Sequence, residues 1–411
     1  MRRASNVHGL ISRPITAGAV AAWLTVSSLA YGQPGDTLRT AIAAFEAGDS
    51  VTAERQLRPL AAQDPEAAAW LAAVLLKRND RQALAEAIRL LNGAAGAGNG
   101  RAKYLLAFQH IAGQGVPKDE SRAAQLFREA ADTGIARAAY NLGVLYAKGR
   151  GVSADQSQAL HWYERATQAG DPYGAYAFAR AIEISPQAAA RTTEMVHAYR
   201  LAAEQGHLPA AIRYGVLLAD GRAGRKDPVE AQRFLRHAAD NGYPEAALAL
   251  GDVSVSIAMN ARGEAARTAA SSAIAWYTAA ANAGVAQAQF KLANALFSGA
   301  GIDRDLPKAE QWYARAGRQG LAEAQYVLGV WKIGGVASAK DPVDGFKWLL
   351  LAERQGNTNA AKIRARSAEK ISAAEISQAE AAAAAFRATP ERQPGRLDDE
   401  APPLKPMAAK P

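Results

Sequence analysis

The stretch that decides the fold reads ARAAYNLGVLYAKGRGVSADQSQALHWYERATQAG and spans residues 136–170. Two amphipathic helical patterns occupy its two halves. They are joined by Gly149-Arg150-Gly151 and closed by Gly170. The paired glycines permit a tight turn, and Asp155 is placed to cap the second helix. The stretch therefore predicts a helix-turn-helix unit.

This unit recurs along the chain, which makes it a repeat protein. A glycine closes each copy, and the spacing between these glycines is 36 residues, except for one spacing of 42. An alanine stands four residues before each closing glycine, and a bulky pair such as Trp162-Tyr163 usually precedes that alanine by one helical turn. Large and small residues one turn apart predict closely packed helices. The closing glycines are Gly98, Gly134, Gly170, Gly206, Gly242, Gly284, Gly320 and Gly356.

Three motifs of the unit resemble the Sel-one-like repeat (SLR) family, relatives of the tetratricopeptide repeats. They are A-x-A-x-Y-N-L-G-x-L-Y at Ala136–Tyr146, G-x-G-V-x-x-D at Gly149–Asp155 and A-L-x-W-Y-x-x-A-x-x-x-G at Ala159–Gly170. The resemblance covers residues 65–356 as eight repeats. It implies an all-α fold, a right-handed α/α superhelical solenoid of repeats of about 36 residues, and a role as a scaffold for protein–protein interaction.

The segments on either side of the repeats predict caps and a tail. Residues 33–64 form one degenerate helical hairpin, which would cover the first repeat, because a solenoid needs its terminal core covered. Residues 357–388 predict C-terminal capping helices, with a capping-box pattern at Ser372–Glu375. Residues 389–411 are rich in proline and polar residues, and we expect them to be disordered.

The first 32 residues predict a secretory signal peptide. Arg2, Arg3 and Arg13 form a basic region, an apolar stretch follows, and small residues at Ala30 and Gly32 predict cleavage before Gln33. The protein is then periplasmic or secreted. Retention of the leader as a membrane anchor is the alternative.

The composition excludes several kinds of site. The chain of 411 residues has no cysteine, so it forms neither disulfides nor thiolate metal sites. Its net charge of +9 is spread out, whereas nucleic-acid binding requires a concentrated basic face. None of its six histidines is paired at i,i+4, and we expect no metal or other cofactor.

The first helices of the repeats carry the candidate partner-binding residues. On a helical wheel, positions 3, 7, 10 and 14 after each closing glycine point away from the core. In the N-terminal half these positions are mostly basic, which favours an acidic segment of a protein partner or an anionic glycan. Ordinary solvated side chains are the alternative. The candidates are Arg101, Arg137, Asn141, Lys148, Arg180, Arg213, Lys291 and Asn294.

Three functions remain compatible with the sequence. The first is an exported adaptor or regulator that binds a protein, in envelope signalling or exopolysaccharide assembly, as the resemblance implies. The second is a glycan- or peptidoglycan-binding module. The third is a cell-wall or β-lactam hydrolase, for which the string Ser367-Ala368-Glu369-Lys370 is the one motif. That string lacks the partner motifs of such enzymes, so we predict no enzymatic activity and no catalytic residue.

Overall fold

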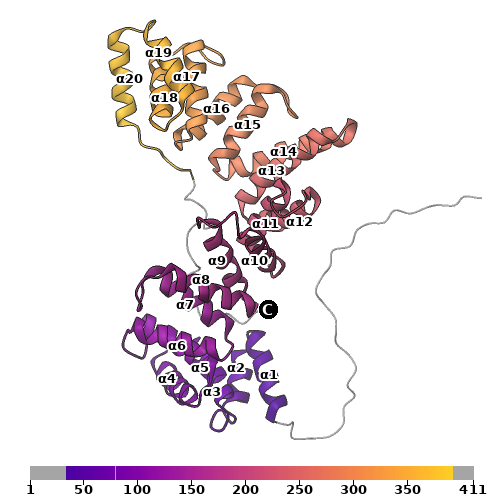
Figure 1. Cartoon of the computed structure of the whole chain (residues 1–411), viewed down its shortest axis with the longest axis vertical. Coiled ribbons are helices and arrows are strands. Elements are labelled where there is room, and N and C mark those ends of the chain that lie inside the picture. Colours follow the sequence, from indigo (N-terminus) through magenta and orange to yellow (C-terminus); the bar gives the residue numbers. More distant parts are fainter. Residues whose placement is uncertain (1–33, 79, 392–411) are drawn as a thin grey trace, which may run out of the picture.

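The computed structural model describes residues 34–78 and 80–391, which form twenty α-helices and no strand (Figure 1). The leader at residues 1–32 lies outside the described residues. The helices are α1 (Pro34–Glu46), α2 (Ser50–Leu57), α3 (Pro65–Leu76), α4 (Arg81–Gly96), α5 (Gly100–Ala112), α6 (Glu120–Asp132), α7 (Ala136–Lys148), α8 (Gln156–Gln168), α9 (Pro172–Glu183), α10 (Thr192–Glu204), α11 (Leu208–Asp220), α12 (Pro228–Asp240), α13 (Pro244–Asn260), α14 (Gly263–Asn282), α15 (Ala286–Ser298), α16 (Leu306–Arg318), α17 (Ala322–Gly334), α18 (Pro342–Arg354), α19 (Thr358–Ala368) and α20 (Ala373–Ala385).

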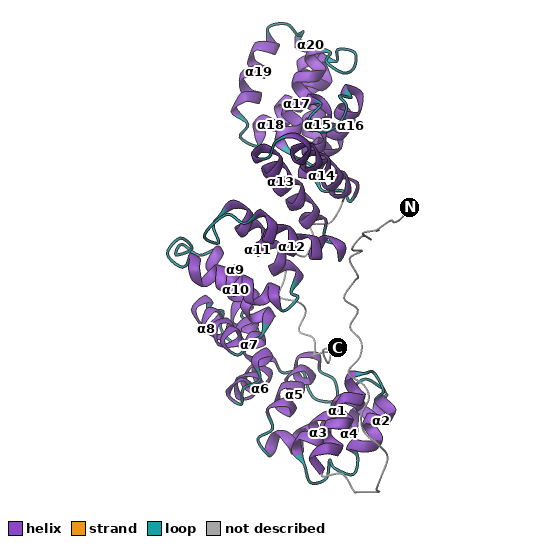
Figure 2. Ribbon diagram, turned by 90° about the vertical axis from the view of Figure 1, so that its right-hand side faces the viewer, coloured by secondary structure: helices purple, strands orange, loops and turns teal. Residues whose placement is uncertain are grey.

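Helices α1 to α18 pack in consecutive pairs, and each pair packs on the next along the chain, while α19 and α20 both pack on α18. Figure 2 shows the result as one curved stack, with α1–α4 at one end and α17–α20 at the other. Several first helices also contact the first helix of the following pair, as α3 contacts α5 and α7 contacts α9. The elements that approach most closely lie on the inner side of a curved stack, so the first helices line its concave face. The predicted all-α solenoid is confirmed.

The predicted turn chemistry is present in the unit of α7 and α8. Gly149 and Gly151 have φ of 63° and 68°, left-handed values that glycine adopts readily. The Asp155 carboxylate accepts hydrogen bonds from the backbone N–H groups of Ser157 and Gln158, at 2.8 and 3.0 Å. The closing Gly170 also has positive φ, 82°. The sequence therefore fixes where each helix of this unit begins and ends.

Buried aromatic and small residues fit together between the two helices of this unit. Trp162 and Tyr163 are both less than a tenth exposed, and Leu142 and Ala166 are fully buried. A Cβ added to Gly143 would lie 2.6 Å from the Tyr163 ring, so only glycine leaves room for that ring. The large and small positions of the repeat are thus structural.

The buried apolar residues fall into two large clusters. One runs from Ala41 to Val253 and the other from Ala247 to Ala383. Partly buried Trp276 packs against both, on the longest helix pair of the array, α13 and α14. These helices have 17 and 20 residues where most others have 13, so the six-residue insertion lengthens both helices of that unit.

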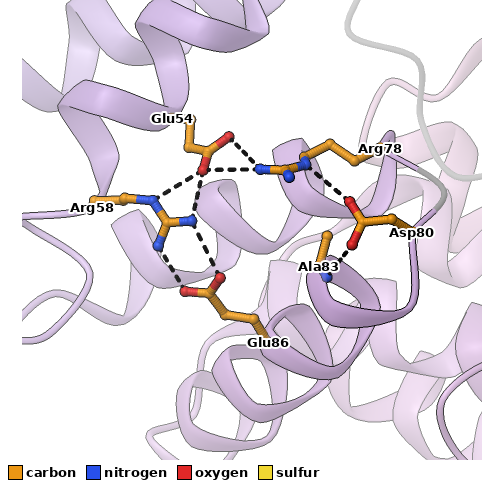
Figure 3. A network of polar contacts seen from close by, with 6 residues as sticks. All are labelled: Glu54, Arg58, Arg78, Asp80, Ala83 and Glu86. Carbon is orange, nitrogen blue, oxygen red and sulfur yellow. Dashed lines mark hydrogen bonds and ion pairs between the residues drawn. The ribbon is translucent and has the colours of Figure 1, made fainter.

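A polar network fastens the N-terminal hairpin of α1 and α2 to the first repeat (Figure 3). Arg58 bonds Glu54 on its own helix at 2.6 Å and Glu86 on α4 at 2.8 Å. Arg78 bonds Glu54 at 3.3 Å and Asp80, the N-cap of α4, at 3.1 Å. The two carboxylates on α2 and α4 share one arginine, which holds the cap in register.

At the other end, α19 and α20 follow the last repeat, and α20 packs on α18. Ser372 and Glu375 form the predicted capping box. The prediction of a disordered tail from Thr389 is wrong for its first three residues, because Thr389 and Glu391 bond to α15 and α16. The remaining predicted tail, residues 392–411, lies outside the described residues.

Candidate protein-interaction face

The eight predicted residues all lie on first helices, as expected. Their positions bring together residues of neighbouring repeats on what we call the first-helix face. They are Arg101 on α5, Arg137, Asn141 and Lys148 on α7, Arg180 on α9, Arg213 on α11, and Lys291 and Asn294 on α15.

Most of the cations of this face already have carboxylate partners on a neighbouring repeat. Arg137 Nε lies 2.7 Å from the carboxylate of Asp171, the N-cap of α9. Lys291 Nζ lies 2.8 Å from Asp252 on α13. Arg101 Nε likewise lies 3.1 Å from Glu66 on α3. The face therefore presents ion pairs rather than the basic stripe that the sequence suggested.

Two of these arginines are also stacked on aromatic rings. The Arg101 guanidinium lies 3.8 Å from the centre of the Trp70 ring, and that of Arg137 lies 4.0 Å from the centre of the Tyr173 ring. The ring and the carboxylate both stabilise such a cation, and together they hold its side chain in one rotamer. We assign Arg101 and Arg137 to the cohesion between repeats.

One of the two asparagines, Asn141, differs from the helical-wheel prediction. Asn141 is only 2% exposed, so its predicted position away from the core is wrong. Its helix, α7, contacts α9 on one side and α6 on another, and this lateral packing covers positions that a single wheel leaves open. Asn294 is exposed, and its side-chain oxygen accepts a hydrogen bond from the Tyr313 hydroxyl at 2.5 Å. Lys148 lies exposed at the end of α7.

Glu183 contacts three polar side chains of the first-helix face between α9 and α11. It accepts hydrogen bonds from the Tyr199 hydroxyl at 2.7 Å and from Arg180 at 2.6 Å, and Arg213 lies 3.9 Å away. Burial by itself would raise the pKa of Glu183, but these bonds and the Arg213 charge lower it overall, so the carboxylate stays ionised.

A hollow of about 200 Å³ opens beside Glu183, between α9, α11 and α13. Its floor is apolar and its rim carries both signs of charge. The lining residues are Glu183, Ile212, Arg213, Val216, Leu217, Arg222 and Glu245. This combination of an apolar floor and a charged rim suits one side chain or a short segment of a protein partner.

A histidine that the sequence did not single out stands next to this region. The His207 ring lies between Tyr173 and Tyr176, with ring centres 4.9 and 4.6 Å away. Its Nδ1 accepts the backbone N–H of Ala210 and so caps α11. Burial, aided by the charge of Arg137, lowers the pKa of His207 from 6.5 to about 4. Its place directly after the closing Gly206, where three other units carry the capping residues Asn99, Asp171 and Asn357, was the available signal.

This low pKa predicts acid sensitivity. The unfolded chain takes up a proton on His207 below about pH 6.5, whereas the folded chain does so only near pH 4, so stability falls as the pH drops through this window. At pH 5 we expect a loss of about 2 kcal/mol relative to neutral pH from this group. The His207→Asn variant keeps a side-chain acceptor that can cap α11. Urea denaturation of this variant at pH 7 and pH 5 should show that the His207 contribution to the loss of stability is gone. An unchanged pH profile would assign the acid sensitivity to other groups.

No cluster of three or more metal-ligating side chains occurs among the described residues. Within that same part of the chain, no helix is long and apolar enough to cross a membrane. Ser367 of the S-x-x-K string is 7% exposed and donates its hydroxyl hydrogen to the Ile363 carbonyl at 2.8 Å. This serine is part of the packing of α19 and is not presented to a substrate.

Comparison with known proteins agrees with the repeat arithmetic. A family model described as the Sel1 repeat matches residues 100–134, 136–171, 208–243, 244–285, 286–321 and 322–357, more than half of the chain. The helix pairs α3–α4 and α9–α10 have the same architecture but fall outside these matches. No curated protein matches the sequence.

Solved structures show the same fold. A protective antigen of uropathogenic Escherichia coli that displays an SLR fold is 23% identical, with a TM-score of 0.55 over 86% of this chain and 84% of that one. A Sel1 repeat protein from Oxalobacter formigenes is 26% identical, with a TM-score of 0.52 over 85% of this chain and 98% of that one. Sel1 repeat arrays are scaffolds that generally mediate protein–protein interaction. By its repeats and its fold, the chain belongs to the Sel1 repeat family.

Proposed function

We propose that this protein is an exported scaffold that binds a protein partner through the first-helix face, centred on the hollow between α9, α11 and α13. The observation that carries the proposal is this hollow itself, since it joins an apolar floor to a charged rim on the concave side of the repeats. A carboxylate of an acidic partner segment would face Arg213 and Arg222 there.

The hollow is a better candidate than the N-terminal part of the face. Arg101 and Arg137 are held by carboxylates within about 3 Å and by aromatic rings, and a partner would have to displace those contacts. Arg222 is more than half exposed, and its ion pair with Asp220 at 2.6 Å is therefore a surface pair. A partner carboxylate could replace such a pair at small cost.

The leader and the repeats together favour a role as a periplasmic adaptor or regulator in envelope signalling or exopolysaccharide assembly. Neither the family nor the mixed charge of the face supports a glycan ligand, so we do not retain one. Mass spectrometry of the protein from the periplasmic fraction would test export: the proposal requires a mature N-terminus at Gln33.

Capture from a crosslinked envelope fraction tests the site. With the wild-type protein as bait, we expect a stoichiometric protein partner. The variant Arg213→Gln/Arg222→Gln should capture about tenfold less of it, which corresponds to about 1.4 kcal/mol of binding free energy. The measurement is quantitative mass spectrometry of the captured protein.

The matched control is Arg233→Gln/Arg236→Gln on α12, which removes the same charge from exposed positions on a second helix. It should capture as much partner as the wild type. Equal losses in both variants would mean that overall charge, and not the hollow, governs binding. Unchanged capture in both would remove the hollow as the site and leave the scaffold assignment intact.

A further inference from the structure

The C-terminal segment Phe386–Glu391 turns back along the solenoid after α20 ends. Phe386 is in an extended conformation, with φ −60° and ψ 133°. The segment leaves α20 and runs past α18 toward α16, as Figure 1 shows. Its last described residue reaches α15, about a hundred residues earlier in the sequence. The segment thus contacts two successive repeats, α17–α18 and α15–α16.

Both ends of the segment are anchored by side chains. The Phe386 ring packs edge-on against Trp348 of α18, with ring centres 5.7 Å apart. The Glu391 carboxylate accepts hydrogen bonds from both Nε and Nη2 of Arg315, at 2.9 and 2.5 Å. It also accepts the Gln289 amide at 2.8 Å. A two-pronged arginine–carboxylate pair is among the stronger and more directional polar contacts in proteins.

Between these anchors the backbone of the segment is also bound. The Thr389 N–H donates to the Arg318 carbonyl at 2.9 Å, at the C-terminal end of α16. The Glu391 N–H donates to the Gln319 side-chain oxygen at 3.1 Å. Backbone bonds hold an extended chain whatever its side chains are, and flanking pockets then select the sequence. The arrangement is that of a bound peptide.

The receiving surface is built by the repeats and does not depend on the segment. The amide of fully buried Gln289 donates to the Ala281 carbonyl at 3.2 Å, and Gln319 donates to Gln289 at 2.8 Å. The next repeat shows the same pair: Gln325 donates to a helix-end carbonyl at 3.0 Å, and Gln355 donates to Gln325 at 2.7 Å. In that second copy no bond to the C-terminal segment is needed to complete the pair.

We propose that this receiving surface, formed by Gln289, Arg315, Arg318, Gln319 and Trp348, is a peptide-binding site that the protein's own C-terminal segment occupies. A partner protein would displace that segment with an extended stretch carrying an aromatic residue and, five positions later, a carboxylate. The segment is poised for exchange, since Arg387, Ala388, Thr389 and Pro390 are exposed. The site is separate from the hollow between α9, α11 and α13 and does not depend on it.

Tethering sets how strongly a partner must bind. A ligand attached by a short linker acts at an effective concentration of about 1 mM. Consider a free peptide that binds the vacant surface with micromolar affinity. While the segment is in place, the apparent affinity of this peptide is lower by orders of magnitude. Loosening the two anchors should reveal the site.

The probe is a fluorescent peptide with the sequence of residues 384–393, AAFRATPERQ, titrated into the full-length protein and followed by anisotropy. The variant Phe386→Ala/Glu391→Gln should bind it at least about tenfold more tightly than the wild type. Adding Arg315→Gln to that variant should weaken binding about tenfold again, and a scrambled peptide should not bind.

Far-UV circular dichroism tests whether each variant is folded. The single variant Glu391→Gln keeps the Phe386 contact, so it should loosen the segment less and bind the peptide with intermediate affinity. A folded release variant that binds neither peptide would overturn the proposal and leave the segment as a structural cap. Equal binding of the scrambled peptide would also overturn it. So would a wild-type dimer formed by exchange of segments between two copies. Capture at the hollow is read from different variants, so failure of either site is distinguishable.

Discussion

Replacing Asp171 with alanine is expected to lower the free energy of unfolding by about 3–5 kcal/mol, the usual cost of removing one member of a buried ion pair. The Asp171 side chain is 5% exposed. It accepts the Gly174 N–H at 3.1 Å as the cap of α9 and binds Arg137 of the preceding repeat at 2.7 Å. Its loss would leave a half-buried guanidinium without a carboxylate at the junction of two repeats. Urea denaturation followed by circular dichroism measures the change.

Two controls separate the functions of this carboxylate. Asp171→Asn keeps a capping oxygen and removes the charge, so it should be less damaging than alanine by about 1 kcal/mol, the usual worth of a cap. A double-mutant cycle with Arg137→Gln should show strong coupling between the two residues. Additive losses would mean that Asp171 acts as a cap alone and that the inter-repeat pair contributes nothing.

Replacing Gly151 with alanine is expected to cost about 3 kcal/mol, through two effects that combine at this turn. Its φ of 68° is unfavourable for alanine by about 1–2 kcal/mol. An added Cβ would also overlap the Glu120 carbonyl at the start of α6, which belongs to the previous repeat. That carbonyl is backbone and cannot rotate away, so the two repeats must separate, at a typical overpacking cost of 1–3 kcal/mol.

Gly170→Ala provides the matched comparison. Its φ is 82°, but an added Cβ would meet nothing within 4 Å. The free energy of unfolding of this variant should therefore fall by only about 1 kcal/mol, the cost of a left-handed backbone conformation for alanine. The same urea titration measures both variants, with hydrogen exchange of α6 and α8 to locate the effect. Equal losses at the two positions would show that contact between repeats at Gly151 is unimportant.

The fold was predictable because its determinants are local and repeated. Gly149, Asp155, Trp162 and Gly170 each act within one unit, and a period of 36 residues exposes their roles without any knowledge of distant contacts. Helix ends, turn glycines and the core pair could all be assigned in this way.

The candidate site was less predictable because its chemistry depends on pairs that the period does not specify. Arg137 appeared free in the sequence, yet its partner Asp171 lies 34 residues later, at a position that is Val285 or Leu321 in other repeats. Asn141 was misplaced because a single-helix wheel ignores the neighbours on either side. The contact of Glu391 with Gln289 spans 102 residues and left no periodic trace.

The division of the core into two clusters at α12–α14 sets the reach that a partner would need. The hollow is lined by residues of the first cluster, whereas Trp348 of the receiving surface belongs to the second. A partner that engages both sites would therefore have to extend past α13 and α14, which have 17 and 20 residues.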